Sequence, residues 1–135
     1  MSSTRIIPPG VSPEAAQLLE RAYALNSDAQ SRALYRDWAE TYDETMLQGL
    51  QYQSPATVAR LLADHLPARQ ARVLDIGCGT GLLGQALATH GFTRIDGLDV
   101  SPEMMEVARR RGVYGDLIAA DLNQPLPVAD ALYEG

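Results

Sequence analysis

The sequence predicts an α/β fold in which a parallel sheet of three strands, in the order 3-2-1, follows a helical N-terminal region. Two observations lead to this prediction. In residues 73–81, Val-Leu-Asp-Ile-Gly-Cys-Gly-Thr-Gly, an apolar run of the kind found in buried strands ends in a glycine-rich turn. Over residues 71–120, short apolar runs then alternate with helical patterns. Alternation of strands and helices is typical of right-handed, parallel α/β units.

The N-terminal part of the chain is expected to be helical. Ser12 and Ser54 are each followed by proline, and a serine cap with proline in the first turn marks a helix start. Residues 12–68 are therefore predicted to form a helical lid region, and residues 1–11 a disordered lead-in. Helices are expected over residues 12–26, 29–40 and 54–66.

Residues 69–135 are expected to form the sheet and its helices. The predicted elements are strands over residues 71–76, 94–100 and 116–120, and helices over residues 80–90 and 101–112. The order 3-2-1 leaves the first strand at an open edge, which natural sheets avoid. We therefore expect half of a larger domain, or a half that pairs with another chain, since a fourth strand would begin only after Ala131.

Composition limits the class of protein. The 135 residues amount to one domain, with 46% hydrophobic and 21% charged residues, as in ordinary globular proteins. The net charge of −6 argues against a nucleic-acid-binding surface. A single cysteine fits a reducing compartment, so a cytoplasmic location is expected. No apolar stretch is long enough for a membrane span, and no membrane partner is expected.

The glycine turn indicates a nucleotide-type site. Gly77, Gly79 and Gly81 allow a sharp turn and a close approach of the backbone to a ligand. Residues 79–84 also match the dinucleotide fingerprint G-x-G-x-x-G, and an acid, Asp99, follows the second strand. The match alone leaves a dinucleotide such as NAD open.

Asp75 favours a cationic ligand over a dinucleotide. Unit charges about 4–5 Å apart interact with roughly 3–4 kcal/mol at an effective dielectric constant near 20. A carboxylate at the lip of the turn would repel a pyrophosphate and attract an ammonium or sulfonium by that order. The alternative is that Asp75 caps the helix that begins near Thr80. The expected cofactor is S-adenosylmethionine.

For other residues at the carboxyl ends of the strands, both a ligand-binding role and a structural role are open. Asp99 suits the two ribose hydroxyls or is a solvated turn residue. Asp121 and the Leu122 amide suit the adenine edge, although a plain Asx-turn fits Asp121 as well. Met104 suits the adenine face or ordinary core packing.

These motifs resemble those of the class I S-adenosylmethionine-dependent methyltransferases, which have a Rossmann-like sheet of seven strands. The resemblance rests on the glycine motif, on Gly97-Leu98-Asp99-Val100-Ser101 with Met104, and on Ala119-Ala120-Asp121-Leu122. Residues 34–43 resemble the N-terminal lid of the members that act on small molecules, and the likeness is greatest to the Williams–Beuren-region methyltransferase-like proteins. The resemblance covers roughly residues 32–128.

The resemblance implies a role for each matching residue. Gly77, Cys78, Gly79 and Gly81 would line the methionine moiety of S-adenosylmethionine, and Asp75 would hold its amino group. Asp99 would take the ribose, Val100 and Met104 would flank the adenine, Asp121 and Leu122 would read its edge, and Tyr42 would close the lid. Cys78 is not expected to be a reactive thiol. No catalytic base and no metal site are named.

Three functions are open at this point. The first is a methyltransferase that acts on a small molecule, with no nucleic acid as partner and incomplete as this chain. The second is an NAD(P)-binding Rossmann protein. The third is a non-enzymatic remnant that associates, for example as a homodimer, through its open sheet edge.

Overall fold

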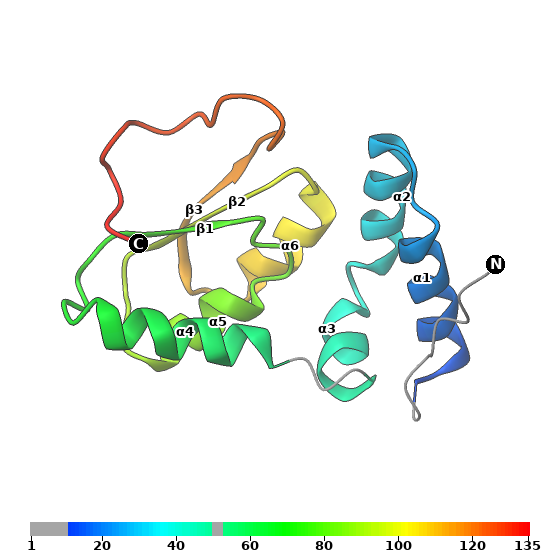
Figure 1. Ribbon diagram of the computed structural model, residues 1–135, viewed down its shortest axis with the longest axis horizontal. Coiled ribbons are helices and arrows are strands. Elements are labelled where there is room, and N and C mark those ends of the chain that lie inside the picture. Colours follow the sequence, from blue (N-terminus) through cyan, green and yellow to red (C-terminus); the bar gives the residue numbers. More distant parts are fainter. Residues whose placement is uncertain (1–10, 50–52) are drawn as a thin grey trace. The chain divides into compact units, whose positions relative to one another are not determined.

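A computed structural model describes residues 11–49 and 53–135 of the chain. It divides into two compact units, residues 1–52 and residues 53–135. The N-terminal unit is helical, and the second unit contains the sheet (Figure 1). Apart from Val11, the expected disordered lead-in lies outside the described residues.

The described part of the N-terminal unit is built from short helices, and the first two of them have serine caps. The Ser12 hydroxyl accepts a hydrogen bond from the Ala15 amide at 3.1 Å, and the Ser27 hydroxyl accepts one from the Gln30 amide at 3.2 Å. The helices are α1 (Pro13–Tyr23), α2 (Asp28–Trp38), α3 (Tyr42–Glu44) and the π-helix η1 (Thr45–Gly49). The sequence patterns predict α1 and α2 but not α3 or η1.

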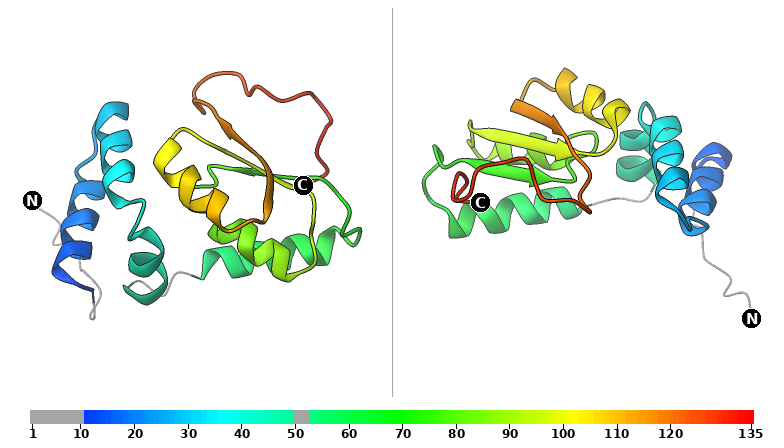
Figure 2. Two further views of the ribbon diagram at one scale, coloured as in Figure 1. Left: turned by 180° about the vertical axis from the view of Figure 1, so that it is seen from behind. Right: turned by 90° about the horizontal axis from the view of Figure 1, so that it is seen from above.

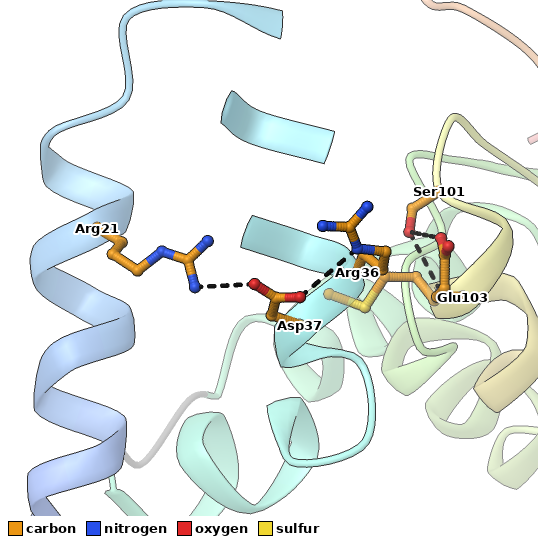
Figure 3. A network of polar contacts seen from close by, with 6 residues as sticks. Arg21, Arg36, Asp37, Ser101 and Glu103 are labelled. Atoms are coloured by element: carbon orange, nitrogen blue, oxygen red, sulfur yellow. Dashed lines mark hydrogen bonds and ion pairs between the residues drawn. The ribbon is translucent and has the colours of Figure 1, made fainter. Parts of the chain in front are cut away.

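Trp38 anchors the core of this unit. Its side chain is buried together with Leu19 and Leu34, and its indole nitrogen donates to the Thr45 hydroxyl at 3.2 Å. Asp37 forms ion pairs with Arg21 at 3.1 Å and with Arg36 at 3.5 Å (Figure 3). Because these charged side chains are about half exposed, the ion pairs add little to stability.

The second unit contains a sheet with strand order β1-β2-β3, in which both neighbouring pairs are parallel. This confirms the predicted α/β class and strand order. In register, Val73 lies opposite Ile95, and Gly97 lies opposite Leu117. The elements are α4 (Ser54–His65), β1 (Val73–Ile76), α5 (Leu82–Thr89), β2 (Ile95–Asp99), α6 (Pro102–Arg110) and β3 (Tyr114–Ala119).

The helix α4 belongs to the sheet unit rather than to the preceding helices. Ala59 and Ala63 of α4 are buried in one core with Val73 of β1 and Leu87 of α5. Figure 1 shows α4 and α5 running side by side along the sheet. The division of the chain thus falls before α4 and not at residue 68, because the apolar face of α4 is buried against α5 and the sheet.

The outer edge of β1 is not open as the strand order alone implies. The Glu134 amide donates to the Arg72 carbonyl at 2.9 Å, and the Leu74 amide donates to the Gly135 carbonyl at 2.9 Å. Figure 2 shows the C-terminal segment returning to β1. The edge on which the expected homodimer would depend is therefore partly covered by the chain's own residues, at Arg72 and Leu74.

Among the described residues, no helix combines the length and the apolar character that a membrane crossing requires.

Candidate functional site

The glycine turn follows β1 directly and has a left-handed backbone. Gly77, Gly79 and Gly81 have φ values of 72°, 54° and 89°, which residues with a side chain rarely adopt. The amides of Gly77 and Cys78 both donate to the Leu98 carbonyl, at 2.7 and 3.0 Å. These two hydrogen bonds hold the turn against β2. The turn lies at the carboxyl end of the parallel sheet, where ligands bind in folds of this class.

Asp99 joins the turn to the end of β2. One carboxylate oxygen, Oδ2, accepts from the Gly79 amide at 2.8 Å, and the other, Oδ1, accepts from the Ser101 amide at 2.9 Å. Each oxygen can accept a further hydrogen bond, so the carboxylate can both hold the turn and receive hydroxyl groups. Asp99 is therefore more than a solvated turn residue, because its carboxylate connects the glycine turn to the start of α6.

Ser101 begins α6 beside this link. Its hydroxyl accepts from the Met104 amide at 3.3 Å and lies 3.5 Å from a carboxylate oxygen of Glu103 (Figure 3). Ser101, Pro102 and Glu103 have the same serine cap and first-turn proline that predict the helix after Ser12, with an acidic residue in the first turn. The cap fixes where α6 begins relative to Asp99.

Asp75 lies beneath the turn and is only 5% exposed. The prediction that it stands at the lip of the turn is wrong, because side chains alternate along a strand and Asp75 shares the helix-facing side of β1 with Val73. The residue at the N-cap of α5 is Gly81, which has no side chain to cap the helix. Asp75 Oδ2 accepts a hydrogen bond from the Tyr114 hydroxyl at 2.7 Å.

The electrostatics of Asp75 follow from this position. Burial raises the pKa of Asp75 above its usual value, the hydrogen bond from Tyr114 lowers it, and the charge of Asp99 raises it further. Burial and the neighbouring Asp75 carboxylate likewise raise the pKa of the Tyr114 hydroxyl. Tyr114 therefore remains a neutral donor, and Asp75 is the partner that titrates.

Tyr114 is the residue of this site that the sequence patterns miss. Its ring passes so close to three glycines that an added Cβ would lie 2.3 Å from it at Gly84, 2.9 Å at Gly81 and 3.0 Å at Gly97. A glycine inside a helix or strand often marks such an approach. Gly84 within α5 and Gly97 within β2 are the signals that could have pointed to a large side chain beneath the turn.

Cys78 sits in the turn with an unreactive thiol. Its side chain is 7% exposed, and burial together with the charges of Asp75 and Asp99 raises the pKa of Cys78 to about 12. Reaction of a cysteine requires the thiolate. We expect iodoacetamide at pH 8 to leave Cys78 unmodified in the folded chain and to modify it once urea unfolds the chain, as measured by intact mass. Rapid modification of the folded chain would contradict the buried placement.

The remaining predicted contacts differ in their accessibility. Val100 and Leu122 are 38% and 46% exposed and available to a ligand, whereas Met104 is 2% exposed, as its core-packing alternative requires. Asp121 Oδ1 accepts from the Asn123 amide at 2.9 Å, which is the Asx-turn that the sequence allows. Contacts of these residues with adenine stay predictions.

Tyr42 belongs to α3 of the N-terminal unit. Its ring meets that of Trp38 edge-on, with 4.9 Å between the ring centroids. This contact places Tyr42 in the aromatic core of its own unit, and its action as a lid stays a prediction.

The comparisons with known proteins find similarity to methyltransferases. Residues 73–134 match a family model described as a methyltransferase domain. The human methyltransferase-like protein 27 is 34% identical over 128 residues, which make up 93% of this chain and 52% of that protein. The chain thus spans about half the length of this relative.

A second group of relatives corrects the expected partners. The 18S rRNA (guanine-N(7))-methyltransferase RID2 of Arabidopsis thaliana is 44% identical over 63 residues, 47% of this chain and 22% of that protein. Bovine and yeast 18S rRNA methyltransferases also match. The expectation of a small-molecule acceptor with no nucleic acid is therefore wrong. The argument against nucleic acid rested on the net charge of −6, and the net charge of a whole chain does not determine what binds at one site.

A solved structure described as the DhpI-SAM-HEP complex shares the fold. Its sequence is 27% identical, and the match has a TM-score of 0.54 and covers 82% of this chain and 46% of that one. A second solved structure, 30% identical with a TM-score of 0.51, is described as the DhpI-SAH complex; it covers 67% of this chain and 42% of that one. The family model, the human relative and the shared fold all make the chain similar to S-adenosylmethionine-dependent methyltransferases.

Proposed function

We propose that this chain binds S-adenosylmethionine at the glycine turn and provides the cofactor half of a methyl-transfer site. The observation that carries the proposal is the joint between the turn and β2, where Asp99 holds the Gly79 amide with one oxygen and the Ser101 amide with the other. This joint brings the turn and a hydroxyl-accepting carboxylate to the same end of the sheet.

The space at the turn suits the cofactor. A Cβ added at Gly79 would meet nothing within 4 Å, so the backbone there is open to an approaching ligand. At Gly77 the first atom met is the side chain of Leu122, at 3.9 Å, and Leu122 is itself half exposed. An apolar surface beside an open backbone turn suits the flat, apolar part of a nucleoside.

Different residues of the site would bind different parts of the cofactor. The turn from Gly77 to Gly81 would receive the methionine part, with Asp75 beneath it as the negative charge nearest to an ammonium group. Asp99 would accept from the ribose hydroxyls, and Val100 and Leu122 would border the adenine. S-adenosylmethionine supplies an activated methyl group, and methyl transfer depends chiefly on orientation of the reacting groups. No proton-transferring residue is assigned.

The buried position of Asp75 also affects discrimination against a dinucleotide. Asp75 and Asp99 both lie at the turn, and the charge of one already disfavours the charge of the other. A pyrophosphate would add two negative charges to this pair, whereas an ammonium would compensate it. The dinucleotide fingerprint over residues 79–84 has a different cause here, since Gly84 makes room for Tyr114.

Calorimetric titration of the chain with S-adenosylhomocysteine tests the proposal, with NAD as the competing ligand. We expect saturable binding of S-adenosylhomocysteine and at least tenfold weaker binding of NAD, as roughly 1.4 kcal/mol of charge discrimination implies. Equal or tighter binding of NAD would establish the dinucleotide alternative. Absence of binding by either ligand would contradict the proposed function. The expected cytoplasmic location rests on the single cysteine and stays a prediction.

A further inference from the structure

We propose that Tyr114 is a positioning residue of the cofactor site: its hydroxyl holds the Asp75 carboxylate beneath the glycine turn and thereby supports binding of the cofactor's ammonium group. Tyr114 itself would not touch the cofactor. This inference rests on the proposed function and names a residue, on β3, that lies outside every motif of the sequence.

The geometry leaves Tyr114 little freedom. Its ring packs against Gly84 of α5, Gly81 of the turn and Gly97 of β2. A Cβ atom added to any of these glycines would lie within about 3 Å of a Tyr114 ring atom. Its hydroxyl reaches Asp75 at 2.7 Å. A side chain confined on several sides holds its donor in one place, so the Asp75 carboxylate has one preferred orientation.

The hydroxyl also favours the charged form of Asp75. A buried carboxylate without a donor takes up a proton more readily, because burial penalises its charge. The groups that face Asp75 are Tyr114 on β3, Asp99 on β2 and Cys78 in the turn. Of these, Tyr114 is the group that lowers the pKa of Asp75, while Asp99 raises it.

Two neighbouring elements complete the surroundings. The α5 segment Leu82–Thr89 contains no titratable residue. At the end of α6, Arg111 donates through Nε to the Thr80 carbonyl at 2.6 Å. That contact is directed at the backbone of the turn, whereas the Tyr114 hydroxyl donates directly to the Asp75 carboxylate.

The test compares Tyr114→Phe with the unaltered chain by calorimetric titration with S-adenosylhomocysteine from pH 6 to pH 8.5. Removal of the hydroxyl raises the pKa of Asp75, so binding should weaken most at the acidic end. We expect the loss of affinity to be larger at pH 6 than at pH 8.5 and to reach at least about tenfold, near the lower limit for a hydrogen bond to a charged group. The ratio of the two dissociation constants cancels titration of the ligand itself.

Tyr133→Phe is the matched control. The Tyr133 hydroxyl donates to Asp96 Oδ2 at 2.8 Å, so this variant also removes a tyrosine–aspartate hydrogen bond from the same sheet. Asp96 accepts the Asp116 amide and lies away from the turn. We expect Tyr133→Phe to leave the affinity unchanged at every pH. Equal losses in both variants would overturn the inference.

A double variant, Tyr114→Phe combined with Asp75→Asn, shows whether Tyr114 acts by holding the Asp75 carboxylate or only by its packing. In an Asp75→Asn background, Tyr114→Phe should cause no further pH-dependent loss, because no carboxylate is left to hold. A loss of the same size in both backgrounds would show that Tyr114 acts only through packing and would overturn the inference. If the unaltered chain bound no S-adenosylhomocysteine, the proposed function would fail first. If it bound normally and Tyr114→Phe did too, only the inference would fail.

Discussion

Gly84→Ala is expected to destabilise the sheet unit by about 2–3 kcal/mol, although alanine ordinarily favours a helix by up to about 1 kcal/mol over glycine. The cause is Tyr114, whose Cζ and hydroxyl oxygen would each lie 2.3 Å from the new Cβ. The ring cannot move aside easily, because Gly81 and Gly97 confine its other edges. Urea unfolding followed by far-ultraviolet circular dichroism measures the effect.

The clash explanation predicts a specific rescue. Tyr114→Leu removes the atoms that the methyl group would strike, so Gly84→Ala should be neutral or stabilising in that background. Gly112→Ala is the control: φ is 70° there and a Cβ would meet nothing within 4 Å. It should cost roughly 1–2 kcal/mol from backbone strain alone, and Tyr114→Leu should not change that cost. A Gly84→Ala chain as stable as the original would contradict the packing described.

Asp75→Asn is expected to separate stability from ligand binding. At pH 7 and without cofactor, the variant should be more stable by about 0.5–2 kcal/mol, because a buried charge is replaced by a neutral group of the same shape. The amide oxygen can still accept from Tyr114. The same variant should bind S-adenosylhomocysteine at least tenfold more weakly, since a charged hydrogen bond is worth roughly 1.5–3 kcal/mol.

The gain in stability should depend on pH with a definite sign. The folded pKa of Asp75 is raised above 3.8, so the folded chain binds this proton more tightly than the unfolded chain. The stability that Asp75 contributes is therefore full below 3.8 and is lost as the pH rises through the folded pKa. The advantage of Asp75→Asn should appear above that folded pKa and vanish in acid.

Asp130→Asn is the control for the change in net charge. Asp130 is exposed, so this variant removes one negative charge without removing a buried one. Its stability should match that of the original chain throughout the pH range. Thermal unfolding of both variants from pH 4 to pH 8 measures the difference. A destabilised Asp75→Asn chain at pH 7 would show that the carboxylate is compensated more fully than its contacts indicate.

The local features of the chain could be predicted from its sequence. The helix starts at Ser12 and Ser101 follow from a capping hydroxyl and the next proline, and both hydroxyls make the expected hydrogen bond. The left-handed glycine turn and the three parallel strands follow from glycine spacing and from apolar periodicity. Each of these signals lies within a few consecutive residues, where backbone sterics and side-chain spacing act directly.

The contacts between distant residues were decided by the tertiary structure. Asp75 and Tyr114 are 39 residues apart, and they meet because the register of β1 on β2 and of β2 on β3 brings them to one side of the sheet. The same applies to α4, whose apolar face is buried by α5, and to Glu134, which covers the edge of β1. Sequence alone determined the left-handed glycine turn and the three parallel strands, because their signals are local. Only packing determined that Asp75 is buried and held by Tyr114, because burial depends on neighbours that no short segment contains.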